Sequence, residues 1–215
     1  MMNTLLDMVR EQFSLSQKSV GEYQKLKAKG MTFEIRQFYA ENLGNISVMS
    51  AKGFFGLMQM DTFILNPVEK DLPLFSYDRI YAMGNDTLII ELYDTVLGEC
   101  KMQGVEAVKS QYSDLPEHDL GKHWYDSIKL KESISKKGKK EQTRKFDEFT
   151  KAYFKAYIDG AGELPNADVL EKKQKASVYV EGLLANGGPS TDVFKKKFGE
   201  AKTAELFRRV LFGVK

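Results

Sequence analysis

The chain has 215 residues and no linker rich in proline, glycine or serine, so its length indicates a single domain over residues 1–215 with one sizeable core. Its formal net charge of +2 argues against a protein built mainly to neutralise nucleic-acid phosphate. Cys100 is the only cysteine, which excludes a disulfide framework and a cysteine-rich metal or iron–sulfur site within the chain.

The first residues predict a helix and no targeting signal. The start MMNTLLDMVREQ places charged residues where a signal peptide needs an apolar core, and no later apolar stretch reaches membrane-spanning length. We therefore expect a cytoplasmic protein without a membrane partner. Between Leu5 and Lys27 one face repeats at helical spacing, which predicts an opening amphipathic helix that ends at Gly30.

Residues 32–95 have the pattern of β-strands. Two segments alternate apolar and polar residues, a third is a longer apolar run, and two more flank the turn GND. The five predicted strands are TFEIRQF (32–38), NISVMSA (45–51), FFGLMQMDTFIL (54–65), DRIYAM (78–83) and TLIIELY (87–93).

The helical pattern returns after Gly98. An aromatic stripe at helical spacing runs from Phe146 to Tyr157, and two more helices are predicted over residues 167–185 and 191–212. Because the strands follow one another without intervening helices, the order indicates an α+β fold. We expect a three-layer α/β/α sandwich, in which N- and C-terminal helices flank a central antiparallel sheet.

The stretch FILNPVEKDLPLFSYD carries an acid into the predicted sheet. If its two strands pair as a hairpin centred on residues 69–70, Asp61 lies directly opposite Asp78 among apolar neighbours. Two carboxylates in contact repel each other, so one would hold its proton near neutral pH, as a general acid must. The alternative is that these acids lie in water at strand ends, or pair with Arg79 or Lys70.

Three segments together resemble the ferredoxin-dependent bilin reductases. In the central one, Asn66-Pro67 is followed by DLPLF and then by Asp78, which matches the aspartate that donates a proton to the bound tetrapyrrole in that family. The closing segment GGPSTDVFKKKFGEAKTAELFRRVLFG and the aromatic helix FDEFTKAYFKAYIDGA are similar to the family's last helices. The resemblance implies reduction of a linear tetrapyrrole such as biliverdin by a radical mechanism.

The sequence also departs from the family at three places. The phycocyanobilin branch has a histidine where this chain has Asp61 and a catalytic glutamate where it has Met49. Several branches carry a second aspartate where this chain has Gly188, with Asp192 nearby. Two functions are therefore considered: reduction of a bilin, or binding and carriage of a tetrapyrrole without redox chemistry.

The resemblance implies a site and an electron donor. Asp78 and Asp61 would supply protons, and external reduced ferredoxin would supply electrons without a permanently bound cofactor. The sequence has no dinucleotide, phosphate-loop or zinc motif. The expected substrate-binding residues form a strand face, an aromatic helix wall and the start of the closing helix: Phe63, Leu65, Ile80, Tyr153, Phe154, Tyr157 and Asp192.

Two further segments allow more than one interpretation. His118 and His123 are spaced poorly for metal ligation, so a solvated loop is favoured, with Trp124 packed beside the pocket. The basic run 129–145 is either a solvated loop that leads into a helix or a docking patch for acidic ferredoxin. The patch would consist of Lys136, Lys137, Lys139 and Lys140. Nucleic acid is a weaker candidate partner, and a monomer is expected.

Overall fold

The computed structural model describes residues 1–99 and 102–215, so Cys100 lies outside the described part of the chain. Its first half, in chain order, contains α1 (Met2–Arg10), β1 (Leu15–Lys18), η1 (Gly21–Gln24), β2 (Lys25–Ala28), β3 (Met31–Ala40), β4 (Gly44–Gly53), η2 (Phe54–Gly56), β5 (Met58–Asn66), β6 (Leu74–Ala82) and β7 (Asn85–Tyr93). Its second half contains α2 (Gln103–Gln111), η3 (Trp124–Ser127), β8 (Ile134–Lys139), η4 (Lys140–Gln142), α3 (Thr143–Ile158), η5 (Ala161–Glu163), α4 (Val169–Asn186), α5 (Pro189–Phe198), α6 (Glu200–Glu205) and η6 (Leu206–Leu211).

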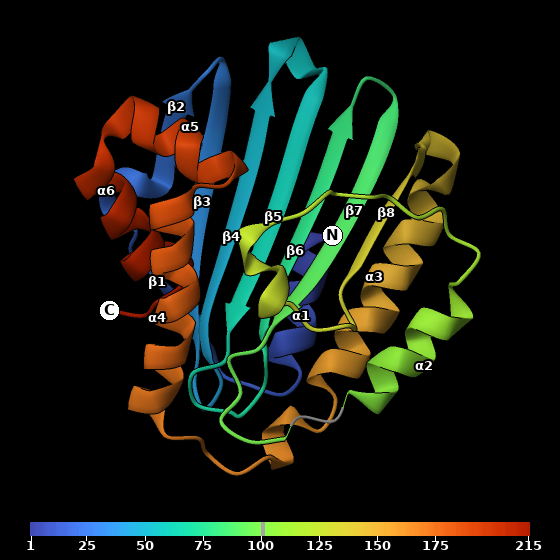
Figure 1. The fold of residues 1–215 in the computed structure, drawn as a ribbon, viewed down its shortest axis with the longest axis vertical. Helices are drawn as coiled ribbons and strands as arrows, with labels where there is room; N and C mark the ends of the chain where they lie inside the picture. The colour runs from blue at the N-terminus through green and yellow to red at the C-terminus, as the bar shows by residue number, and fades with distance from the viewer. Residues whose placement is uncertain (100–101) are drawn as a thin grey trace.

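Eight strands of the described residues form one antiparallel sheet (Figure 1). Their order is β1-β3-β4-β5-β6-β7-β8, and β2 also pairs with β3. From β3 to β7 each strand lies beside its neighbour in sequence, as expected for segments joined by short turns. The predicted strands thus form the centre of the sheet.

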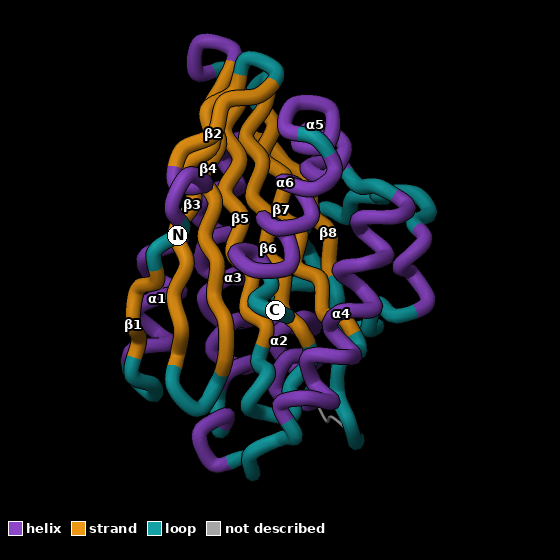
Figure 2. The backbone as a smooth tube through the Cα atoms, turned by 90° about the vertical axis from the view of Figure 1, so that its left-hand side faces the viewer, coloured by secondary structure: helices purple, strands orange, loops and turns teal. Residues whose placement is uncertain are grey.

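Helices cover both faces of the sheet, and a separate apolar core lies between the sheet and the helices on each face (Figures 1 and 2). Residues of α1, α2 and α3 join the core on one face, which we call the α3 face. Residues of α4, α5 and η6 join the core on the other, which we call the α4 face. The predicted α+β class, with an antiparallel sheet between helical layers, is confirmed.

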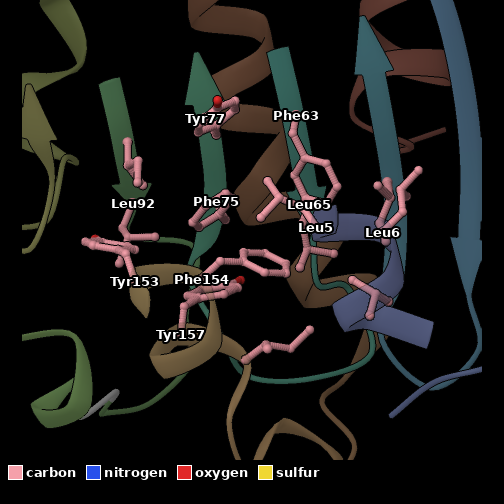
Figure 3. Close-up of a cluster of buried hydrophobic side chains, with 14 of the residues drawn as sticks. Leu5, Leu6, Phe63, Leu65, Phe75, Tyr77, Leu92, Tyr153, Phe154 and Tyr157 are labelled. Carbon is pink, nitrogen blue, oxygen red and sulfur yellow. The ribbon is translucent and has the colours of Figure 1, made fainter. Parts of the chain in front are cut away.

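The aromatic stripe of α3 is buried against the middle of the sheet (Figure 3). The ring of Phe154 lies 5.5 Å from that of Phe63 and 5.1 Å from that of Phe75, both edge to face. Residues three and four apart share one side of a helix, which is why a stripe at this spacing faces a single surface. The stripe therefore forms core on the α3 face.

Three predictions of secondary structure were wrong: two helices differ in extent, and a strand lies where a loop was predicted. The opening helix ends at Arg10, and residues 15–28 instead form two four-residue edge strands around a 3₁₀ turn. The predicted helix over residues 191–212 is interrupted at Gly199, whose φ of 81° is a left-handed conformation that glycine adopts readily. Strand β8 lies within the basic run. Its sequence, ISKKGK, does not alternate apolar and polar residues, because lysine occupies buried and exposed positions alike.

Candidate functional site

The pairing of β5 with β6 places Asp61 and Asp78 on opposite faces of the sheet. Thr62 lies opposite Asp78, and Asp61 lies opposite Arg79. The true register differs by one residue from the predicted hairpin, and a shift of one residue moves a side chain to the other face. The prediction that the two aspartates form a cross-strand pair is therefore wrong.

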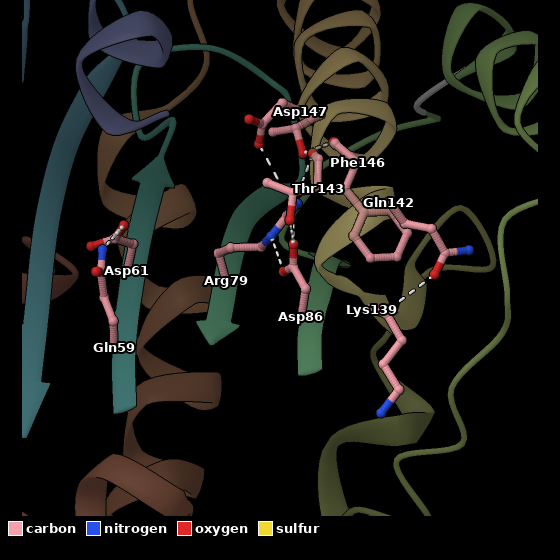
Figure 4. Close-up of polar contacts among 10 residues, drawn as sticks. Gln59, Asp61, Arg79, Asp86, Lys139, Gln142, Thr143, Phe146 and Asp147 are labelled. Carbon is pink, nitrogen blue, oxygen red and sulfur yellow. Dashed lines mark hydrogen bonds and ion pairs between the residues drawn. The ribbon is translucent and has the colours of Figure 1, made fainter. Parts of the chain in front are cut away.

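Asp61 lies on the α3 face and forms local hydrogen bonds (Figure 4). Its carboxylate accepts a hydrogen bond of 2.7 Å from Ser50 Oγ and one of 3.2 Å from Gln59 Nε2. The sheet itself separates this carboxylate from Asp78. Asp61 is therefore unable to share a proton with Asp78 directly.

Asp78 borders a cavity of about 200 Å³ on the α4 face. The central strands β4 to β7 form its floor, while α4, the start of α5, η6 and the segment 120–125 form its walls. The polar side chains of its lining are those of Thr62, Ser76, Asp78, Glu91, Tyr93, His123, Tyr125, Tyr179, Ser190 and Thr191. This combination of apolar surface and polar groups that converge on one space is typical of sites for small organic molecules.

Burial makes Asp78 a carboxyl group that can hold a proton near neutral pH. The pKa of Asp78 is raised from 3.8 to about 6, chiefly by burial and to a smaller extent by the nearby charge of Glu91. Thr62 Oγ1 donates a hydrogen bond to Asp78 Oδ1, which opposes this rise in pKa because it stabilises the carboxylate. Asp78 thus has the property expected of a general acid, without the carboxylate pair that the sequence suggested.

A second carboxyl group of the cavity, Glu91, was missed in the sequence. Glu91 is 7% exposed and accepts a hydrogen bond of 2.5 Å from the hydroxyl of Tyr93. The ammonium group of Lys129 lies 3.7 Å from its other oxygen. Glu91 interrupts the apolar strand TLIIELY as Asp78 interrupts β6, so the signal that identified one acid was also present for the other.

Aromatic rings form one wall of the cavity. The rings of Tyr93 and Tyr179 stack with centroids 4.0 Å apart, and those of His123 and Tyr125 stack at 4.9 Å. The Nδ1 atom of His123 is buried without a hydrogen-bond partner among the described residues. Trp124 packs beside this wall, as predicted, with its ring 5.9 Å from that of Tyr179.

Of the predicted substrate-binding residues, Ile80 alone lines this cavity. The side chains predicted to share the pocket with Asp78 lie in the core of the α3 face (Figure 3): Phe63, Leu65, Tyr153, Phe154 and Tyr157. That part of the prediction is wrong: the shifted register misplaced Phe63 and Leu65, and the aromatic helix α3 covers the face of the sheet opposite to the cavity. Asp192 is exposed on α5 and does not line the cavity, whereas its neighbours Ser190 and Thr191 do.

Thr62 on β5 lies between Asp78 on β6 and Met49 on β4. Met49 also lines the cavity. The row Met49, Thr62 and Asp78 crosses three neighbouring strands and contains one acid.

The described residues contain no group of three or more histidine, cysteine, aspartate or glutamate side chains placed to hold a metal ion.

The four lysines predicted to dock a partner do not form one exposed patch. Lys136 is 4% exposed and donates a hydrogen bond of 3.2 Å to the backbone oxygen of Leu115. It also pairs with Glu117. Lys137, Lys139 and Lys140 are exposed. Lys136 is thus removed from the predicted docking patch, because its ammonium group is already bound within the protein.

Comparison with known proteins identifies the class of fold. The antiparallel sheet between two helical layers is also the fold of a phytochromobilin synthase. The chain is similar to the crystal structure of phytochromobilin synthase from tomato in complex with biliverdin, with a TM-score of 0.79 and 16% sequence identity over 99% of this chain and 82% of that one. At this identity the likeness shows a common fold. Neither known protein families nor curated proteins gave a match to the sequence.

No helix of the described residues is long and apolar enough to cross a bilayer.

Proposed function

We propose that this protein binds a linear tetrapyrrole such as biliverdin in the Asp78 cavity and reduces it with electrons from ferredoxin. The observation that carries the proposal is a carboxyl group with a pKa of about 6 in an aromatic cavity of this fold. The likeness to a protein that holds biliverdin supports the class of ligand.

The residues of the cavity suit the chemistry of such a pigment. A bilin has extended π faces, pyrrole nitrogens, lactam oxygens and propionates. Tyr93, Tyr125 and Tyr179 offer aromatic surface, while Ser190 and Thr191 offer hydroxyl groups. Reduction of one double bond takes two electrons and two protons. In the proposed mechanism ferredoxin gives the electrons singly, through a bilin radical.

Asp78 supplies the first proton in this mechanism. Its protonated form gives the proton to the reduced pigment and becomes a carboxylate, which the hydroxyl of Thr62 stabilises. Solvent then returns a proton to Asp78 before the second transfer. We assign Glu91, in the same cavity, the role of a negative charge that favours the protonated form of Asp78.

Binding of an entire tetrapyrrole requires the cavity to widen. Its volume of about 200 Å³ is below the range of about 300–1,000 Å³ for sites that enclose a ligand of drug size. The floor is a hydrogen-bonded sheet, whereas the walls include the short 3₁₀ turn η3 and the start of α5. We expect these walls to move outward and the strands to stay in place.

The test is optical. Purified protein is mixed with biliverdin, the visible spectrum is recorded, and reduced ferredoxin is then added without oxygen. We expect a shifted spectrum on binding, followed by its conversion to that of a reduced pigment. Absence of any spectral change with biliverdin would contradict the proposal, both for binding and for reduction.

A tetrapyrrole carrier without redox activity is the second candidate. Met49 favours it, because a thioether donates no proton and the row through Thr62 then contains Asp78 as its one acid. The same experiment separates the two functions. A spectrum that shifts with biliverdin and stays constant after addition of reduced ferredoxin would identify the carrier.

Exposed lysines at the end of β8 are the proposed ferredoxin contact. Replacing Lys137, Lys139 and Lys140 with glutamine should slow reduction several-fold at low ionic strength and leave bilin affinity unchanged. The difference should fade as salt is raised, because ions screen the attraction. The measurement is the initial rate against ionic strength.

The matched control removes the same charge elsewhere. Lys18, Lys151 and Lys155 are exposed on other elements, and their replacement with glutamine should have a smaller effect. Equal effects of the two triple variants would show that overall charge, not this patch, governs the encounter.

A further inference from the structure

One end of the sheet exposes large apolar side chains that no packing explains. Phe54, Phe55, Leu57 and Met83 have exposed fractions of 53%, 108%, 72% and 91%. They are half of the exposed large hydrophobic residues in the described chain. A cluster of such side chains usually marks a contact surface.

The strand register places these residues side by side. The turn after β2, the turn between β4 and β5, the turn between β6 and β7, and the end of β8 lie in one row (Figures 1 and 2). The row runs through the paired residues Met31, Gly53, Met58, Ala82, Asn85 and Lys139. With strands about 4.8 Å apart, it is roughly 24 Å wide. The molecule thus ends in a line of hairpin tips.

Two of these apolar residues occupy turn positions whose backbone conformation disfavours bulky side chains. Met83 and Phe55 have φ values of 51° and 56°, in the left-handed region where bulky residues are uncommon. Asparagine or glycine is favoured at such positions. The turn between β3 and β4, at the opposite end of the sheet, has Asn42 at its positive φ. Folding of the turns therefore does not explain the apolar residues at this end.

Positive charge surrounds the apolar tips. Lys29, Lys52 and Lys139 are exposed at or next to these turns. In the tip segments 27–31, 52–58, 82–85 and 137–141, Glu141 is the sole acidic residue. Protruding apolar side chains with lysines beside them match the interface of an anionic bilayer, where rings enter the headgroup region and ammonium groups meet lipid phosphate.

A protein partner matches the tips less well. Protein interfaces of standard size bury about 800 Å² on each partner around a packed core. Here the apolar residues protrude from two narrow turns, with charged residues on either side. Fluid lipid can surround such separate side chains without a matching shape.

We propose that the hairpin-tip surface, formed by Lys29, Lys52, Phe54, Phe55, Leu57 and Met83, docks the protein end-on to an anionic lipid bilayer. The contact is peripheral and leaves the Asp78 cavity, on the α4 face of the sheet, away from the lipid. It is independent of the proposed reduction, and it differs from the expectation of no membrane partner drawn from the sequence.

The test is sedimentation of the whole protein with vesicles. Binding is expected to vesicles of phosphatidylcholine with phosphatidylserine, and to be much weaker with phosphatidylcholine alone. The variant Phe54→Asn/Phe55→Asn should weaken binding about tenfold or more, because two rings no longer leave water. Asparagine tolerates positive φ, so this variant should keep the fold, as measured by circular dichroism.

The charge variant and the control complete the design. Lys29→Gln/Lys52→Gln should weaken binding to anionic vesicles about tenfold or more, and high salt should do the same. The matched control Leu170→Asn/Val178→Asn removes two apolar residues of α4 that are each 67% exposed, and it should bind as the unchanged protein does. In addition, tryptophan fluorescence of Phe55→Trp should shift to shorter wavelength with anionic vesicles.

Three results would overturn the proposal. They are no binding to anionic vesicles, equal binding by the unchanged protein and the Phe54→Asn/Phe55→Asn variant, or an unshifted Phe55→Trp spectrum. Loss of binding to an acidic protein in the tip variant, without any vesicle binding, would assign the surface to a protein partner instead.

Discussion

The variant Asp78→Asn is expected to bind biliverdin with nearly unchanged affinity and to reduce it about 10²- to 10⁴-fold more slowly. The amide keeps the volume and the hydrogen bond with Thr62 but has no acidic proton to give. Binding is measured by spectral titration and turnover by the anaerobic assay. Asp61→Asn is the matched control, because Asp61 lies on the other face of the sheet. Full turnover by Asp78→Asn would exclude Asp78 as the donor.

The pH dependence follows from the raised pKa of Asp78. A donor must be protonated, so the rate should fall as pH rises through about 6, where Asp78 loses its proton. In Thr62→Val the carboxylate loses a stabilising hydrogen bond, so its pKa should rise and the fall in rate should move to higher pH. An unchanged profile in Thr62→Val would show that another group controls it.

Replacement of the Asp78 carboxyl should raise the stability of the protein at neutral pH, although it lowers activity. The pKa of Asp78 is about 6 in the folded protein and about 3.8 in the unfolded chain. Between pH 3.8 and 6 the folded protein therefore binds more protons than the unfolded chain does. Its unfolding free energy therefore falls as pH rises from about 4 to 6, by at most about 3 kcal/mol. Asp78→Asn should lack this loss and be the more stable protein at pH 8 in urea denaturation.

The largest loss of stability is expected for Asp86→Asn. Arg79 and Asp86 form a bidentate ion pair in which both side chains are 1% exposed (Figure 4). Thr143 Oγ1 donates a further hydrogen bond of 2.7 Å to Asp86. Removing the negative charge leaves a buried guanidinium uncompensated except by Asp147 at 3.7 Å. We expect a decrease of about 3–5 kcal/mol in unfolding free energy.

An exposed ion pair provides the control for that measurement. Lys25 and Glu34 lie 3.3 Å apart with both side chains more than half exposed. Glu34→Gln should change the urea midpoint little, corresponding to less than about 1 kcal/mol. If Asp86→Asn were as mild as Glu34→Gln, the buried pair would be contributing no more than a surface one.

The sequence predicted the centre of the fold because its signals there are local. Alternation identified β3 and β4, the turn GND identified β7, and the aromatic spacing identified α3. The register of β5 and β6 was not predictable from alternation, since the loop 67–73 allows either of two adjacent registers. The shift of one residue placed Asp61, Phe63 and Leu65 in the predicted pocket, whereas they lie on the opposite face of the sheet.

The site was predictable in its central acid and not in its walls. Asp78 stands out because an acid interrupts an apolar strand, and Glu91 carries the same signal. His123, Tyr125 and Tyr179 come from a loop and a helix whose position over the sheet depends on long-range packing. No local pattern indicates which of many aromatic residues face that cavity.

Both edges of the sheet have features that hinder the pairing of its edge strands with those of another copy of the protein. At one edge β1 and β2 are four residues each and are separated by η1, so neither offers a long row of free backbone groups. At the other edge, residues 116–118 bond to the outer side of β8 through Lys137 N and Ser135 O. Lysine charge along β8 opposes the approach of a second chain. The basic run 129–145 thereby hinders the addition of a further strand at this edge, and so hinders aggregation. This effect does not depend on whether a redox partner binds the same lysines.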